Sequence, residues 1–180
     1  CGPRVARIGL NDYRLLVEAR RWLADAEDEV SIARAEYEEA ETRLEEVQDF
    51  ASYVDRDVSP RWPNSSAASA ARQKLGTLVS ERTDLARLEL RSASRRRDLA
   101  NAQLIQARAE TAVRHDISNY DLDPIIADTQ RARDAVAEIA EQVETQRAQV
   151  DQATADFWEA YGAYVRSGGR DDVLWGWQSE

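Results

Sequence analysis

Methionine is absent from this 180-residue sequence, and cysteine and histidine occur once each. The single cysteine, Cys1, cannot form an internal disulfide, which excludes a small domain held together by disulfides. Glycine occurs seven times and proline four times, and Pro3, Pro60, Pro63 and Pro124 leave three long stretches uninterrupted. No segment approaches the roughly 18 consecutive apolar residues of a membrane-spanning helix, so none is predicted.

Acidic residues outnumber basic ones by 34 to 24, which gives a formal net charge of −10. Binding to nucleic acid depends on neutralising phosphates with Lys and Arg, so this balance argues against a nucleic-acid partner. Apolar residues make up 43% of the chain and charged residues 32%. This composition, rich in Ala, Glu and Arg, is typical of long helices in a folded protein.

Apolar residues recur in alternating steps of three and four, which predicts helices over residues 12–57, 65–118 and 124–167. In the first segment they are Leu16, Ala19, Leu23, Ala26, Val30, Ala33, Tyr37, Ala40, Leu44, Val47, Ala51 and Val54. In the third they are Ile125, Ala132, Val136, Ile139, Val143, Val150, Ala153, Phe157, Ala160 and Tyr164, with Thr129 and Gln146 as polar members of the same series. Such spacing keeps one seam of each helix against a partner.

The second segment carries two apolar stripes. One passes through Ala71, Leu75, Leu78, Leu85, Leu88, Leu99, Ala102, Ala109 and Val113, and the other through Val79, Ala86, Leu90, Ala93, Ala100, Leu104 and Ala107. Two stripes imply two neighbours, so this helix is expected in the middle. The predicted fold class is therefore all-α, a long antiparallel three-helix coiled-coil bundle.

Residues that start or stop helices agree with these segments. Pro60 ends the first helix, Ser65 and Ser66 cap the second, Asp123 with Pro124 starts the third, and Gly168-Gly169 ends it. We expect residues 1–10 to be a tether, 11–167 the bundle, and 168–180 an acidic tail that contains tryptophan.

Charge is distributed in blocks along the first two helices. Residues 25–49 contain eleven acids and two arginines, whereas residues 71–97 contain eight bases and three acids. A turn near residue 60 would bring these blocks side by side in an antiparallel hairpin. The blocks then favour one pairing over its alternatives.

Nine of the thirteen aromatic residues fall at the end of the predicted bundle far from Cys1: Phe50, Tyr53, Trp62, Phe157, Trp158, Tyr161, Tyr164, Trp175 and Trp177. Clustered Trp and Tyr are typical anchors of protein interfaces, so we predict a docking site for a protein partner there, formed by Trp62, Trp158, Trp175 and Trp177. In a second interpretation, Trp158 and Tyr161 close the core and the tail folds back over it.

No arrangement of residues predicts catalysis, a small-molecule substrate, a cofactor or a metal site. The only histidine, His115, lies beside Asp116 and is interpreted as a solvated residue. Asp116, Asp121 and Asp123 lack the ligand spacing of a calcium-binding loop. We therefore expect a protein that is not an enzyme.

The sequence starts with cysteine rather than methionine, which suggests a mature or trimmed chain. Cys1-Gly2-Pro3 resembles the mature N-terminus of bacterial lipoproteins, whose signal peptide is cleaved before a lipidated cysteine. The resemblance implies a diacylglycerol and an acyl chain on Cys1, and Gly2 in place of Asp is similar to the outer-membrane sorting pattern. It therefore implies a lipid-anchored periplasmic spacer, scaffold or accessory subunit of a cell-envelope complex, with oligomerisation possible.

The lipoprotein that is linked covalently to peptidoglycan uses a C-terminal lysine, whereas this chain ends in Gln178-Ser179-Glu180 and its one lysine is Lys74. Such a linkage is not expected here. Two alternatives stay open. One is a helical-hairpin adaptor of an efflux or secretion assembly. The other is a cytoplasmic coiled-coil interaction module, in which Cys1 is an artefact of where the sequence starts.

Overall fold

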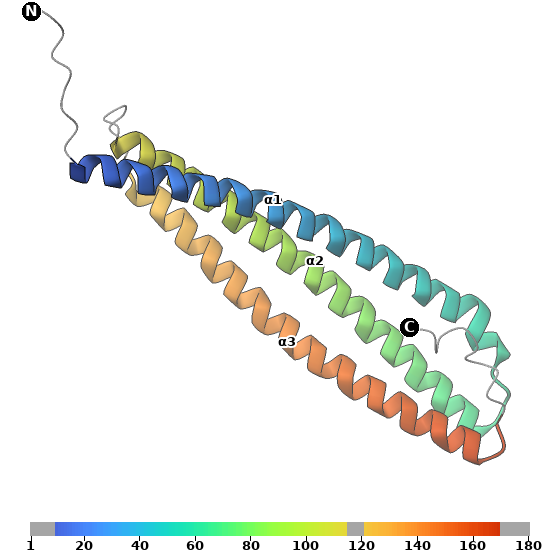
Figure 1. Cartoon of the computed structure of the whole chain (residues 1–180). Helices are drawn as coiled ribbons and strands as arrows, with labels where there is room; N and C mark the ends of the chain where they lie inside the picture. The colour runs from blue at the N-terminus through green and yellow to red at the C-terminus, as the bar shows by residue number, and fades with distance from the viewer. Residues whose placement is uncertain (1–9, 115–120, 170–180) are drawn as a thin grey trace, which may run out of the picture. The chain divides into compact units, whose positions relative to one another are not determined.

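The computed structural model describes residues 10–114 and 121–169, except for the side chains at positions 10–13 and 16. These residues form three long helices, α1 (Leu10–Tyr53), α2 (Ser66–Arg114) and α3 (Asp123–Arg166). Helix α1 packs on α2, α2 packs on α3, and the described ranges contain no strand (Figure 1). The predicted all-α fold of three long helices is confirmed.

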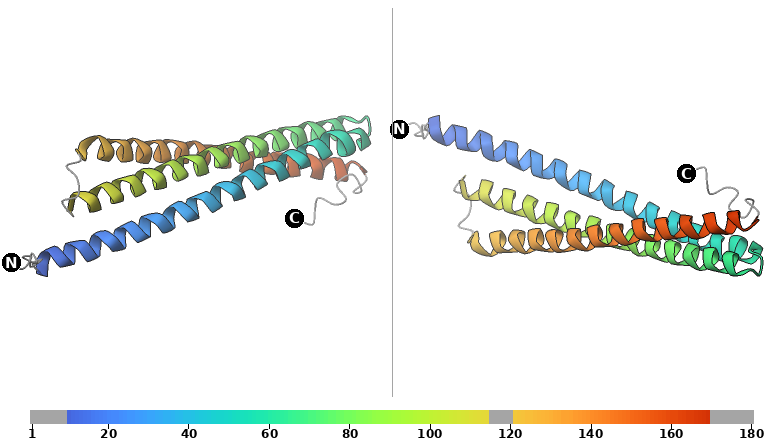
Figure 2. Two further views of the ribbon diagram at one scale, coloured as in Figure 1. Left: turned by 90° about the horizontal axis from the view of Figure 1, so that it is seen from above. Right: turned by 90° about the horizontal axis from the view of Figure 1, so that it is seen from below.

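The chain forms two compact units, each of which holds part of all three helices. Unit 1 comprises Cys1–Tyr37 and Ala93–Glu138, and unit 2 comprises Glu38–Ser92 and Ile139–Glu180. In both views of Figure 2, the teal end of α1, the green start of α2 and the red end of α3 lie together as unit 2.

The most deeply buried side chains of unit 1 are small. They are seven alanines and one threonine: Ala19, Ala26, Ala33, Ala93, Ala100, Ala107, Ala109 and Thr129. The larger apolar residues of the predicted seams, such as Leu23 and Val30, are only partly buried. The buried Thr129 hydroxyl donates a hydrogen bond within its own helix, to the Ile125 carbonyl oxygen at 3.1 Å.

Two contacts set the antiparallel register of α1 and α2 in unit 1. The guanidinium of Arg96 lies 3.6 Å from the carboxylate of Glu36, and that of Arg97 lies 4.0 Å from the centroid of the Tyr37 ring. In this register the buried alanines of α1 lie in the same layers as the buried alanines of α2. The two sets stay in step along the helices because each recurs every seven residues. Alanine on both sides lets the two backbones approach closely.

Helix α2 lies between α1 and α3 in unit 1, and both views of Figure 2 agree on this order. Ala107 and Ala109 are both buried, although they point to nearly opposite sides of the helix. The carbonyl oxygen of Ala102 faces α3, where the Thr129 hydroxyl approaches it at 3.5 Å. The prediction that α2 is the middle helix with two neighbours is therefore confirmed.

Unit 2 has a core of large side chains. Its continuous cluster consists of Val54, Val58, Trp62, Ala68, Ala71, Leu75, Leu78, Val79, Ala153, Phe157, Tyr161 and Tyr164. Among the described residues, Phe157, Leu75 and Leu78 are almost completely inaccessible to solvent. Since burial of apolar surface stabilises a fold roughly in proportion to area, each of these large buried side chains contributes more than a buried alanine of unit 1.

Helix α1 changes geometry before it stops. Its α-helical part ends at Tyr53, and the predicted remainder to residue 57 is instead a π-helical turn, Val54–Val58, followed by a 3-10 turn, Ser59–Arg61. Pro60 has no N–H to donate, and its ring disfavours α geometry in the residue before it. The wider turn, in which the Ser59 N–H donates to the Val54 carbonyl oxygen, buries both Val54 and Val58 in the core of unit 2.

The predicted start of α2 is confirmed, because the Ser65 hydroxyl accepts the Ala68 N–H at 3.1 Å. Helix α3 starts at Asp123 as predicted, and the carboxylate of Asp121 accepts the Asp123 N–H at 3.1 Å. The expected end of α2 at residue 118 lies outside the described residues.

The predicted glycine stop of α3 is confirmed as well. Gly168 has a φ of +92°, and the Gly169 N–H donates to the Tyr164 carbonyl oxygen at 3.0 Å. A Cβ at position 169 would lie 2.5 Å from the Tyr164 ring. Only glycine therefore lets the chain pass this close to the aromatic core.

We expect Ala26→Asp to lower the free energy of unfolding by about 3 kcal/mol, because it buries an unpaired charge in the seam of α1. Ala26 is 5% exposed. The matched control is Ala35→Asp on the exposed side of the same helix, which should change stability by less than about 0.5 kcal/mol. Urea unfolding followed by circular dichroism measures both, and equal effects would show that Ala26 is not a seam residue.

Candidate functional site

Four aromatic residues line up along the last turns of α3 in unit 2. Phe157 and Tyr161 stack at 5.8 Å between ring centroids with an interplanar angle of 22°. Trp158 meets the edges of the same two rings, at 5.2 Å from Phe157 and 5.8 Å from Tyr161. Tyr164 continues the series at 6.2 Å from Tyr161. These contacts hold every ring of the cluster in place by at least one neighbour.

Trp62 does not lie on the surface, contrary to the expectation that it presents an exposed docking side chain. It is 5% exposed and belongs to the core of unit 2. The 3-10 turn ahead of it, closed by the Trp62 N–H on the Ser59 carbonyl oxygen, directs the indole inward. There it packs on Tyr164 at 5.3 Å and meets Tyr161 edge-on at 6.3 Å.

The indole Nε1 of Trp62 is buried, and the described residues offer it no hydrogen-bond acceptor. A buried donor without a partner costs free energy. The aromatic packing must therefore outweigh this cost.

Trp158 is the predicted docking residue that the structure places on the surface, with 43% of its area exposed. It lies eleven residues after Arg147, which is three turns of helix, so both side chains occupy nearly the same face of α3. The remaining predicted site residues, Cys1, Trp175 and Trp177, lie outside the described residues. The structure therefore brings Trp62 and Trp158 to the same cluster, one buried and one exposed.

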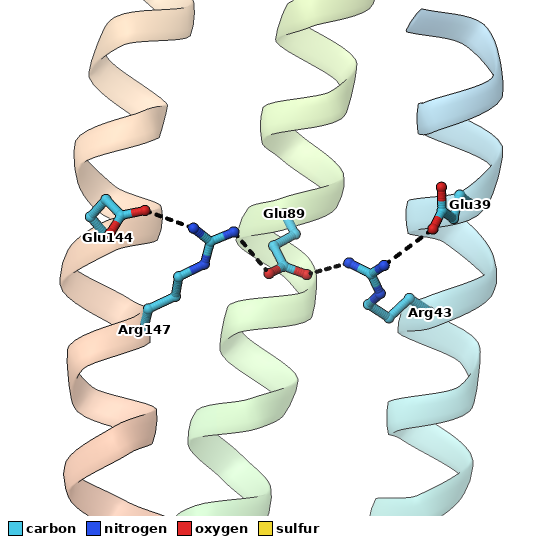
Figure 3. Close-up of polar contacts among 5 residues, drawn as sticks. All are labelled: Glu39, Arg43, Glu89, Glu144 and Arg147. Atoms are coloured by element: carbon cyan, nitrogen blue, oxygen red, sulfur yellow. Dashed lines mark hydrogen bonds and ion pairs between the residues drawn. The ribbon is translucent and has the colours of Figure 1, made fainter. Parts of the chain in front are cut away.

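A charged network joins the three helices of unit 2 (Figure 3). The carboxylate of Glu89 on α2 receives Arg43 of α1 at 3.2 Å and Arg147 of α3 at 3.6 Å. Each arginine also pairs with an acid of its own helix, Arg43 with Glu39 at 3.3 Å and Arg147 with Glu144 at 2.7 Å. The Glu89 side chain is only 18% exposed, whereas the four others are at least half exposed. Glu89 is therefore the shared centre of the network.

Glu89 belongs to a line of α2 residues that shares Leu75 with the first apolar stripe and then continues between the two stripes. Residues seven apart share one face, and this line reads Ala68, Leu75, Arg82 and Glu89 within unit 2. Ala68 and Leu75 are buried at 0% and 1% exposure, whereas Arg82 and Glu89 are only partly buried. The line changes from apolar to charged, and on α2 the continuous core cluster of unit 2 ends at Val79, before Arg82.

A cleft of about 620 Å³ lies at this point in unit 2. It is lined by Arg43, Glu46, Val47, Asp49, Phe50, Arg82, Leu85, Ala86, Glu89 and Val150, which come from all three helices. The Arg82 guanidinium lies over the Phe50 ring, 5.4 Å from its centroid. The cleft therefore has apolar walls from Val47, Phe50, Leu85 and Val150, and charged groups at its edges.

Sequence reasoning missed this cleft and the Glu89 network. The signal was present, because Arg82 and Glu89 follow Leu75 at seven-residue intervals between two apolar stripes. A charged residue at a position that faces both neighbours cannot be covered as leucine can. The positions of Arg82 and Glu89, taken together with the two apolar stripes of α2, would have predicted a cleft between the helices.

Polar groups in the seam are satisfied. Gln146 of α3, a polar member of the predicted seam, donates from Nε2 to the Glu81 carbonyl oxygen at 3.0 Å and also to the Glu81 carboxylate. No group of three or more possible metal ligands occurs among the described residues. In the same part of the chain, no helix has the length and apolarity that a membrane span requires.

No known protein family, curated protein or solved structure matches this chain.

We expect Glu89→Gln to lower the free energy of unfolding by about 1–2 kcal/mol, since it removes the charge that two arginines share. Glu144→Gln is the matched control, because Glu144 is 71% exposed and pairs with Arg147 alone. It should cost less than about 0.5 kcal/mol. Thermal or urea unfolding at low and high salt measures the difference. Equal losses for the two variants would contradict a central role for Glu89.

Proposed function

We propose that this chain is a non-enzymatic helical scaffold that binds a partner protein through the aromatic cluster and cleft of unit 2. The observation that carries the proposal is Trp158, a large aromatic residue that is 43% exposed and yet held by two ring contacts. A side chain that is already ordered loses little conformational entropy on binding, which is why rigid aromatic residues dominate interface energetics.

The surroundings of Trp158 support docking rather than simple closure of the core. Phe157 and Tyr161 are buried, so the cluster already has its core members without the indole of Trp158. The cleft takes Val150 from α3, and Trp158 lies eight residues further along the same helix, about 12 Å away along its axis. An exposed aromatic anchor and a cleft with apolar walls in the same unit together have the composition of an interface centre.

The cellular setting expected from Cys1 is a separate proposal: a lipid-anchored protein of the bacterial outer membrane that faces the periplasm and serves as a spacer, scaffold or accessory subunit. Cys1 lies outside the described residues, so the proposal depends on the sequence resemblance alone. The test is the intact mass of the natively expressed protein with fragmentation of its N-terminal peptide. Several hundred daltons of added mass on Cys1 would support the anchor, and an unmodified Cys1 would exclude it.

The docking proposal is tested by a photo-crosslinking amino acid at position 158 in the native cell. We expect a defined adduct with one partner, identified by mass spectrometry. The control position is Ile105, a 55% exposed apolar residue of unit 1, which should give no such adduct. Equal adducts from both positions, or none from position 158, would contradict the proposal.

Binding is then reconstituted with the purified partner. We expect Trp158→Ala to raise the Kd at least about ten-fold with unchanged helicity, as for truncation of an aromatic anchor. Ile105→Ala should leave the Kd unchanged. Isothermal titration calorimetry measures both variants, and circular dichroism checks that neither loses helix.

A further inference from the structure

The cleft of unit 2 is flanked by acidic helix faces. Within this unit, residues 38–53 of α1 contain six acids and one arginine, and residues 139–166 of α3 contain five acids and two arginines. Two of these three arginines, Arg43 and Arg147, are already engaged by Glu89 and by an acid of their own helix. The charged residues that line the cleft itself are three acids and two arginines, Glu46, Asp49, Glu89, Arg43 and Arg82, so the lining keeps a formal charge of −1.

Two of the acids that line the cleft form no ion pair with the described residues, although Arg43 and Arg82 line the same cleft. Glu46 and Asp49 are exposed residues of α1, and no described Lys or Arg lies within ion-pair distance of either carboxylate. Asp49 and Glu46 lie three residues apart, so they project along the same side of the helix. Apolar walls come from Val47, Phe50 and Val150 directly beside them.

We propose that the cleft binds a basic amphipathic helix of the partner, with apolar side chains in the cleft and Lys or Arg against Glu46 and Asp49. A helix in a groove inserts residues spaced three, four and seven apart, and a cleft of 620 Å³ accommodates a few such side chains rather than a whole domain. The inference rests on the docking function proposed for this face and assigns the chemistry of its partner.

Net charge disfavours the two competing occupants, although residues 71–97 of any copy carry eight bases and three acids. A second copy of this chain carries a net charge of −10, and acidic faces placed opposite one another repel. The segment 170–180 of the same chain contains three acids and one arginine, so it lacks the complementary charge as well. A basic helix meets both the apolar walls and the unpaired carboxylates.

The probe is a fluorescent peptide of about 18 residues built from Leu and Lys with an amphipathic helical pattern, compared with a peptide that has Glu in place of every Lys. Binding to the full chain is measured by fluorescence anisotropy. We expect the Leu–Lys peptide to bind in a salt-dependent manner and the Leu–Glu peptide to bind at least about ten-fold more weakly. Equal binding of both peptides, or no binding of either, would overturn the proposal.

The double variant Glu46→Lys with Asp49→Lys locates the site. Its matched control is Asp25→Lys with Asp28→Lys, which makes the same charge change at the same spacing on exposed residues of α1 in unit 1. We expect the first pair to raise the Kd of the Leu–Lys peptide about ten-fold or more and the control pair to change it less than two-fold. Equal effects would mean that the peptide senses net charge alone and would overturn the cleft assignment.

Three further outcomes would also overturn it. Peptide binding that appears only after Trp175 and Trp177 are replaced by Ser would identify segment 170–180 as the occupant. Concentration-dependent dimerisation that Glu46→Lys with Asp49→Lys abolishes would identify a second copy. A partner crosslinked at position 158 through an acidic or non-helical segment would refute the basic helix while leaving the docking function in place. Melting temperatures of all variants confirm that each one is folded.

Discussion

Helix α2 has to satisfy two neighbours at once, and the residues between its two apolar stripes decide how closely those neighbours can approach each other. Where this line is Ala68 and Leu75, all three helices of unit 2 share one core with Trp62 and Phe157. Where it becomes Arg82 and Glu89, the same helices are held by ion pairs around a cleft. A partly buried charge must keep partners or solvent, so the charged residues of α2 prevent a closed apolar core at this point.

The aromatic cluster depends on the same arrangement. Because the core of unit 2 is closed up to Leu75, the end of α3 can bury Phe157, Tyr161 and Tyr164 against it, and the turn after α1 adds Trp62. Trp158 then has neighbours that are themselves fixed. A surface residue with so rigid a support is well suited to recognition, since little order has to be created when a partner arrives.

The helices and their seams were predictable, because a spacing of three and four is a property of each helix alone and survives any packing. The seam positions Ala26, Ala100 and Val143 are buried as that spacing requires. The burial of Trp62 was not predictable, since it depends on how a turn of Pro and Ser folds back onto α3. The cleft was predictable in part: the charged line on α2 is visible in sequence, but the meeting of Glu89 with Arg43 and Arg147 depends on both registers at once.

The seven-residue repeat of alanine in unit 1 has a kinetic consequence. If α1 slid along α2 by one repeat, Ala26 would take the place of Ala33 against the same partner, and the alanine contacts would be almost unchanged. A hairpin displaced by seven residues is therefore close in free energy to the native one during folding. Only contacts of side chains that do not recur every seven residues disfavour it. Arg97 over the Tyr37 ring is such a contact, because the residues one repeat away from Tyr37 are Val30 and Leu44. A few side chains that do not follow the seven-residue repeat thus select the native register of two helices whose alanine contacts alone would allow several registers.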